Sequence, residues 1–167
     1  AVSLEYRNVV ERNYTDYYNT INIRKGYSVT DKADGERNLL LIAPDGNIYL
    51  MSRKNVVKYM GCKGNTALTI LDGEYITKTK DNKNICMYMA FDIYFYKGED
   101  VRNNILFRSK EDVEGGRIDK SRLEYLKDLL DELQLEHDTD TMQLKIESKK
   151  FYYGNADSYN LDIENEI

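Results

Sequence analysis

The sequence is poor in the residues that build disulfide frameworks and metal clusters. It has two cysteines and one histidine in 167 residues. Cys62 and Cys86 lie far apart in the chain, and no Cys/His cluster with the spacing of a metal site surrounds them. We therefore interpret both as reduced thiols, with Cys86 in the core.

Long apolar runs are also absent. No run approaches the ~18 residues that a membrane-spanning helix requires, and the N-terminus lacks the basic-then-apolar pattern of a signal peptide. These absences argue against a membrane or secreted protein. We expect no membrane partner and a cytoplasmic or nuclear-type compartment.

Positive charge is scarce. The formal net charge is -5, so the chain lacks the broad basic surface that non-specific nucleic-acid binding usually needs. If RNA is a substrate, a local patch or another part of the protein must hold it. Tryptophan is absent, whereas tyrosine occurs 15 times. These tyrosines fall mostly in strand-like and helix-like stretches, where half-buried packing is a better interpretation than base stacking.

The patterns that are present predict one α+β domain over residues 1–167. Hydrophobic spacing predicts helices at 4–21, 119–135 and 156–167. The second of these has leucines on one face, and Asp119 or Ser121 could cap it. Short β-prone runs predict strands at 27–30, 38–43, 47–52, 66–77, 85–96 and 142–153, with a hairpin turn at 44–46. We expect mainly antiparallel sheets with flanking helices.

The segment Asp31–Arg37 combines a lysine, acids, a glycine and an arginine between two β-prone runs. A lysine amine becomes nucleophilic when desolvation or neighbouring cations lower its pKa, and an arginine can also grip a phosphate. Lys32 and Arg37 are therefore candidates for covalent catalysis. The alternative is a charged hairpin turn with Gly35 in a left-handed conformation.

Two further segments carry acids inside β-prone runs. Glu74 follows Asp72 and Gly73, and Asp92 follows Phe91 in the most hydrophobic stretch of the chain. A buried carboxylate needs a partner or lines a site, so Asp92 is a candidate functional residue. The alternatives are a solvated strand end for Glu74 and a structural hydrogen-bond anchor for Asp92.

In order and spacing, these segments resemble the covalent nucleotidyltransferases, the superfamily of mRNA capping enzymes and polynucleotide ligases. Residues 32–37 match the nucleophile motif lysine-any-aspartate-glycine-any-arginine, 72–74 match the acidic motif aspartate-glycine-glutamate, and 91–93 match the aromatic-aspartate motif. Within this superfamily, the sequence pattern most resembles that of capping enzymes of large DNA viruses. The resemblance implies a nucleotidyltransferase (ATP-grasp-like) domain. The family's later motifs and its OB-type domain are absent, so we expect a partial domain truncated from a longer enzyme.

The resemblance also implies a role for each candidate residue. Lys32 would attack the α-phosphate of GTP to form a lysine-linked GMP, which is then transferred to the 5′-diphosphate end of RNA. Mg²⁺ or Mn²⁺ would assist, with Arg37 and Glu74 as catalytic residues and Glu74 as a tentative metal ligand. The implied nucleotide-binding residues are Asp34, Gly35, Arg53, Phe91 and Asp92.

The implied partners are GTP, the RNA end, and an RNA triphosphatase and a methyltransferase that are fused or associated. A viral enzyme of this kind would act in the cytoplasm, in the viral factory or in the virion. Two alternatives stay open. One is an adenylating fragment of an ATP-dependent DNA or RNA ligase, and the other is an inert nucleotidyltransferase-like scaffold for a polymerase or methyltransferase. We expect the isolated piece to be inactive or weak.

Overall fold

The computed structural model describes residues 28–108, 114–116, 119–138 and 142–153, and the chain divides into two compact units. The smaller unit contains residues 1–32 and 150–167, and the larger contains residues 33–149. In the smaller unit, β1 (Ser28–Val29) pairs antiparallel with β10 (Tyr152–Tyr153). The helices expected at 4–21 and 156–167 lie outside the described residues.

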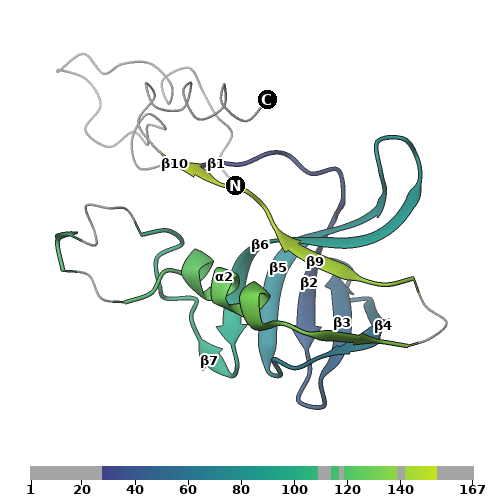
Figure 1. Cartoon of the computed structure of the whole chain (residues 1–167), viewed down its shortest axis with the longest axis horizontal. Helices are drawn as coiled ribbons and strands as arrows, with labels where there is room; N and C mark the ends of the chain where they lie inside the picture. Colours follow the sequence, from purple (N-terminus) through teal and green to yellow (C-terminus); the bar gives the residue numbers. More distant parts are fainter. Residues whose placement is uncertain (1–27, 109–113, 117–118, 139–141, 154–167) are drawn as a thin grey trace. The chain divides into compact units, whose positions relative to one another are not determined.

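The larger unit is an eight-stranded sheet in the order β7-β6-β5-β2-β3-β4-β8, with β9 pairing with β6 off this path (Figure 1). Neighbouring strands are antiparallel except β9, which runs parallel to β6. The strands are β2 (Glu36–Ile42), β3 (Asn47–Ser52), β4 (Val57–Gly64), β5 (Thr69–Lys78), β6 (Asn84–Tyr96), β7 (Glu99–Asp100), β8 (Leu135–His137) and β9 (Lys145–Ser148).

The hairpin between β2 and β3 is confirmed. Gly46 has a φ of 83°, and its N–H donates to the carbonyl of Ala43 at 2.9 Å, which closes the turn. Strand β4 was not among the expected strands. Its exposed first half and buried centre, interrupted by two glycines and three lysine or tyrosine side chains, do not show the simple alternation that predicts a strand.

Residues 142–153 form two short strands rather than the single strand that was expected. β9 ends at Ser148, and β10 belongs to the other unit. Continuous pairing with β6 ends here, where Lys149 donates its N–H to the carbonyl of Ala90 at 2.8 Å. The α+β prediction is therefore correct only in part: the described residues are mostly sheet, with α2 as the one long helix among them.

Helix α2 (Arg122–Glu132) packs on one face of the sheet. Ser121 is its N-cap, and a capping box with Glu124 satisfies the first turn. Leu126 and Leu129 are fully buried, which confirms the predicted leucine face. The core consists of Leu40, Ile42, Ile48, Leu50, Met60, Cys62, Leu71, Cys86, Tyr88, Ala90, Ile93, Val101, Leu126, Leu129 and Leu144.

Both cysteines are free and Cys86 is in the core, as predicted, and Cys62 is buried as well. Burial raises the pKa of the Cys62 thiol to about 11, so this side chain is uncharged at neutral pH. Within the described parts of the chain, no helix has the length and apolar character to cross a bilayer.

Candidate functional site

Side chains along β2 and β5 point alternately to the two faces of the sheet, one of which is the core and the other polar. Leu40 pairs with Leu71, and both side chains lie in the core. Arg37, three positions before Leu40 on β2, pairs with Glu74, three positions after Leu71 on β5. An odd number of positions reverses the face, so these two side chains lie on the opposite face. Asp72 shares this face with them.

Arg37 and Asp72 form a bidentate ion pair. Arg37 donates from Nε to Oδ1 of Asp72 at 3.0 Å and from Nη2 to Oδ2 at 2.5 Å, and Tyr94 donates its hydroxyl to the same Oδ2 at 2.6 Å. Asp72 is only 1% exposed. Its hydrogen bonds raise the pKa of Arg37, while burial and then the bond to Asp72 raise the pKa of Tyr94. Both donors therefore stay protonated, and the guanidinium of Arg37 is fixed in place.

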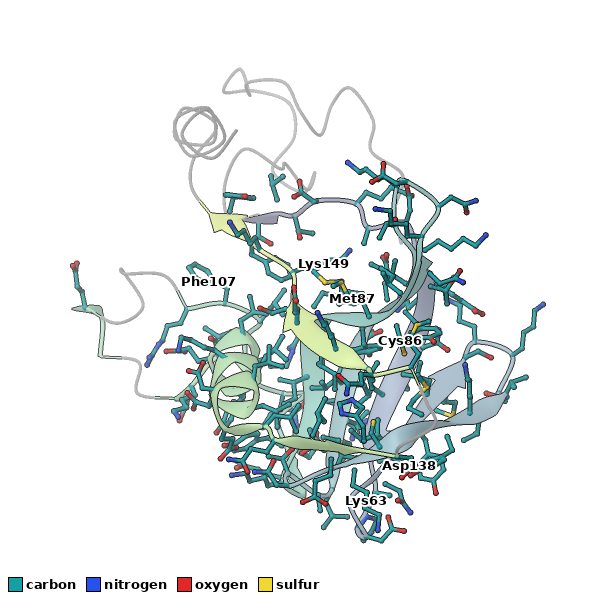
Figure 2. The ribbon with its side chains drawn as sticks, turned by 45° about the vertical axis from the view of Figure 1, so that its right-hand side comes forward. Lys63, Cys86, Met87, Phe107, Asp138 and Lys149 are labelled. Carbon is teal, nitrogen blue, oxygen red and sulfur yellow. The ribbon has the colours of Figure 1, made fainter. Side chains whose placement is uncertain are left out.

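Phe91 has two cations near its ring. The guanidinium carbon of Arg37 is 5.5 Å from the ring centroid, and Nζ of Lys149 is 5.3 Å from it. Lys149 follows β9 (Figure 2), and its Nζ donates to Oε1 of Glu74 at 3.3 Å. The other carboxylate oxygen of Glu74, Oε2, is buried and has no hydrogen-bond partner among the described residues. A buried acceptor without a donor is costly, so this atom is suited to a ligand that carries hydroxyl or amine groups.

The two motif glycines are explained by close packing. A Cβ on Gly35 would lie 2.9 Å from the carbonyl oxygen of Tyr75 and 3.2 Å from Cβ of Glu74. Gly35 is therefore not the left-handed turn residue of the alternative interpretation, since its φ is not positive. Its missing side chain lets the residue before β2 lie directly against β5, which brings residues 35–37 next to the acidic motif.

Gly73 makes room for a buried tyrosine. A Cβ here would lie 2.6 Å from the carbonyl oxygen of Met89 and 2.6 Å from Cζ of Tyr88. The Tyr88 hydroxyl donates to the carbonyls of Asn38 at 2.8 Å and Leu71 at 3.2 Å. The glycine thus holds β5 against β6 at the position that presents Asp72 and Glu74.

Three further predicted residues are Lys32, Asp34 and Arg53. Lys32 belongs to the smaller unit, in the segment between β1 and β2. Asp34 directly precedes Gly35 in the larger unit. Arg53 follows β3, whose last residue, Ser52, pairs with Asn38, so Arg53 lies at the same end of the sheet as Arg37.

Asp92 has a structural partner. It accepts hydrogen bonds from Nε of Arg122 at 2.7 Å and Nη2 of Arg122 at 3.0 Å, and the same arginine donates to the carbonyl of Asn104 at 2.6 Å. These contacts tie β6 to the start of α2. They correspond to the structural-anchor alternative for Asp92.

Replacing Arg122 with glutamine is expected to lower the free energy of unfolding by about 2 kcal/mol, because it leaves the partly buried carboxylate of Asp92 without its cation. The matched control is Lys127→Gln, which breaks an exposed pair with Asp131 in the same helix and should cost no more than about 0.5 kcal/mol. Urea denaturation measures both values. Equal losses in the two variants would show that Asp92 is not anchored through Arg122.

Sequence reasoning missed three members of the site: Asp72 as the partner of Arg37, Tyr94, and Lys149. Asp72 belongs to the acidic motif, but nothing in the sequence marks it or Tyr94 as a partner of Arg37, because these contacts depend on the pairing of β5 with β2 and β6. Lys149 lies inside the single strand that the sequence predicted at 142–153. Only the parallel pairing of β9 with β6 brings it to Glu74.

A metal site built by the protein alone is not visible in the described ranges, which contain no group of three His, Cys, Asp or Glu side chains that could hold an ion. Both oxygens of Asp72 are engaged by Arg37 and Tyr94. Oε2 of Glu74 could contribute one ligand. The residues present fit a divalent ion that is held mainly by ligand phosphates, as is usual for Mg²⁺.

Comparisons with known proteins give three findings. The family model for the catalytic domain of mRNA capping enzymes matches residues 19–162. A probable mRNA-capping enzyme of Acanthamoeba polyphaga mimivirus is 38% identical over 103 residues, which is 60% of this chain and 8% of that protein. The solved structure of mycobacterial DNA ligase D complexed with ATP and MES aligns with a TM-score of 0.46 at 13% identity, over 83% of this chain and 44% of that one. The chain thus spans less than half the length of either protein.

Proposed function

Because the chain belongs to the family of mRNA capping enzyme catalytic domains, we propose that it is the nucleotide-binding part of an mRNA guanylyltransferase. The observation that carries the proposal is the group formed by Arg37, Glu74, Phe91 and Lys149. Two cations lie beside one aromatic ring, and one of them binds a carboxylate whose second oxygen has no partner among the described residues. A purine nucleotide offers a partner for each of these groups.

The reaction proceeds in two displacements. Nζ of Lys32, deprotonated to solvent, attacks the α-phosphorus of GTP; a nitrogen–phosphorus bond forms as the α–β phosphoanhydride bond breaks, and pyrophosphate leaves. In the second step, a β-phosphate oxygen of diphosphate-ended RNA attacks the same phosphorus. The bond to Lys32 breaks, the amine regains a proton, and GMP is now joined to RNA.

The residues of the larger unit bind and orient the nucleotide. Phe91 stacks on the base, and Oε2 of Glu74 accepts hydrogen bonds from ribose hydroxyls or contributes to the metal. Arg37, fixed by Asp72 and Tyr94, places its charge toward phosphate oxygens, and Arg53 lies at the same end of the sheet for sugar or phosphate. A bound Mg²⁺ or Mn²⁺ would neutralise charge on the triphosphate. The cation of Lys149, 5.3 Å from the centroid of the Phe91 ring, would neighbour a nucleotide bound at this ring.

The test is covalent labelling with α-labelled nucleotide. The full-length parent and this chain are incubated separately with labelled GTP or labelled ATP and Mg²⁺, and label that survives denaturing electrophoresis is counted. We expect label from GTP on the parent, and weak or no label on the isolated chain. Label from ATP alone would instead assign a ligase-type adenylyltransferase. If neither nucleotide labels the parent, the inert scaffold is the alternative that remains.

A further inference from the structure

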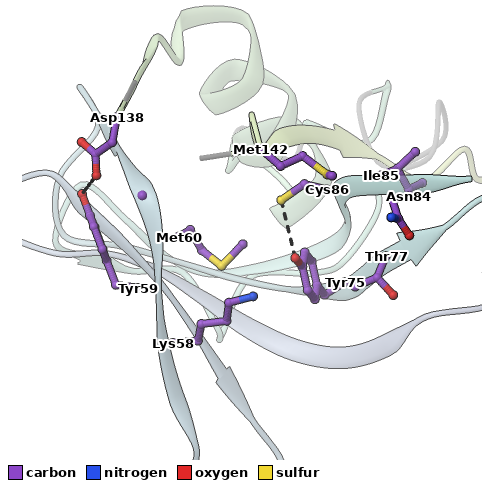
Figure 3. A pocket seen from close by; sticks show the side chains of 11 residues that line it. Lys58, Tyr59, Met60, Tyr75, Thr77, Asn84, Ile85, Cys86, Asp138 and Met142 are labelled. Carbon is purple, nitrogen blue, oxygen red and sulfur yellow. Dashed lines mark hydrogen bonds between the residues drawn. The ribbon is translucent and has the colours of Figure 1, made fainter. Parts of the chain in front are cut away.

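A cavity lies on the core side of the sheet, on the face opposite the candidate nucleotide site. It has a volume of about 500 Å³, and its walls include Lys58, Tyr59, Met60, Tyr75, Asn84 and Cys86 (Figure 3). Glu74 and Tyr75 are consecutive on β5, so the nucleotide site and this cavity lie on opposite faces of one strand end. Nothing in the proposed reaction steps uses the cavity.

The cavity occupies an opening between two strand edges. Among the described residues, β4 pairs with β8 only at Cys62–Gly64, and β6 pairs with β9 only at 87–90. The first residues of both β4 and β6 are therefore open on these sides. Lys58 and Tyr59 come from one edge, and Asn84 comes from the other.

Two tyrosine rings in the cavity are held in fixed positions. Tyr59 is 41% exposed, its ring lies 5.5 Å from that of Tyr49, and its hydroxyl donates to Asp138 at 3.2 Å. Nζ of Lys58 lies 5.4 Å from the Tyr75 ring. The Tyr75 hydroxyl lies 3.5 Å from the sulfur of Cys86. Oriented rings with a cation beside them are what sequence-tolerant binding of a nucleobase requires.

Positive charge gathers at this end of a chain that is acidic overall. Strands β2, β4 and β6 begin here, and β3 and β5 end here. Lys78 and Lys83 directly adjoin Thr77 and Asn84, which line the cavity. Among the described residues at this end, the basic ones include Arg37, Arg53, Lys54, Lys58, Lys78, Lys80 and Lys83, and the acidic ones include Asp34, Glu36, Glu74, Asp81 and Asp138.

We propose that this cavity and the lysines around it bind the acceptor RNA, with one nucleobase against Tyr59 and Tyr75 and the backbone phosphates along Lys58, Lys78 and Lys83. The inference rests on the proposed function, because that function supplies RNA as the acceptor. It explains how an acidic chain holds a polyanion: a local basic end replaces a broad basic surface. The RNA end would reach the nucleotide across the same strand ends that carry Arg37 and Glu74.

The experiment measures binding of a short single-stranded RNA, fluorescently labelled at its 3′ end, to the full chain by anisotropy at low salt. The triple variant Lys58→Ala, Lys78→Ala, Lys83→Ala should lose at least tenfold in affinity, and its salt slope should fall by about 2, since each phosphate contact of a single strand contributes ~0.7. The control, Lys63→Ala, Lys97→Ala, Lys127→Ala, removes the same charge elsewhere and should lose less than twofold.

The stacking component has its own readout. Tyr59→Leu should weaken binding of ordinary RNA at least fivefold while leaving an abasic RNA of equal length unaffected. Equal losses in the two triple variants, no RNA binding by the unaltered chain, or binding of extended peptides in place of RNA would each overturn the proposal. Lysine–GMP formation by the parent carrying the Lys58, Lys78 and Lys83 substitutions should be unchanged. If GTP does not label the unaltered parent, the proposed function is refuted, whatever the RNA-binding result.

Discussion

Replacing Lys32 with alanine is expected to abolish covalent labelling of the full-length parent by GTP. The amine of Lys32 is the atom that forms the nitrogen–phosphorus bond in the proposed first step, and no neighbouring group can replace a nucleophile that has been removed. We expect a loss of at least a thousandfold, to the background of the denaturing gel. Nucleotide binding without chemistry should weaken much less, because Arg37, Glu74, Phe91 and Lys149 remain.

The matched variant Lys32→Arg separates nucleophilic from electrostatic roles. Arginine keeps the positive charge but stays protonated at any ordinary pH, so it cannot attack phosphorus. A nucleophilic Lys32 predicts that both variants are equally unlabelled. Substantial labelling of Lys32→Arg would mean that the side chain only attracts the triphosphate and that another residue carries the nucleotide.

Replacing Gly73 with alanine is expected to destabilise the larger unit by more than about 3 kcal/mol. The new methyl group would lie 2.6 Å from a backbone carbonyl of β6 and from the ring of Tyr88, neither of which can move without breaking the β5–β6 pairing. Tyr88 is fully buried, and its hydroxyl donates hydrogen bonds to two backbone carbonyls. Displacing the ring therefore also leaves polar groups without partners. Thermal and urea denaturation followed by circular dichroism measure the change.

Gly64→Ala is the control for this prediction. The nearest atom to a Cβ at Gly64 is a terminal methyl of Leu133 at 3.1 Å, which can rotate away. We expect a loss of about 1 kcal/mol or less for this variant. A Gly73→Ala protein as stable as Gly64→Ala would show that β5 and β6 can separate at this point, contrary to the packing described.

The sequence predicted the elements whose signals are local. The turn at Gly46, the strand 47–52, the leucine face of α2 and its Ser121 cap depend on residues within a few positions of one another. The acidic and lysine motifs were likewise recognisable because each is a short run. The structure brings Arg37 and Glu74 opposite each other, as a shared site requires.

Features that depend on pairing between distant strands could not be predicted. The parallel strand β9 looked like the first half of one longer strand, and Lys149 therefore had no assigned partner. Asp92 matched a functional motif, but its bidentate contact with Arg122 depends on where α2 packs. The alternative of a left-handed turn at Gly35 is wrong, because its missing side chain allows close approach to Tyr75. In each case the deciding contact joins residues that no sequence window contains.

The parallel pairing of β9 with β6 also fixes the order in which the site can assemble during synthesis. Lys149 follows its partner Glu74 by 75 residues. At ~5–20 residues per second, the ribosome needs roughly 4–15 s to make that intervening stretch. Until then β6 lacks this neighbour, and Phe91 and Glu74 lack the cation of Lys149. A nascent chain can thus form the β2–β3 hairpin early, but it completes its candidate nucleotide site only when the last strand of the larger unit has left the ribosome.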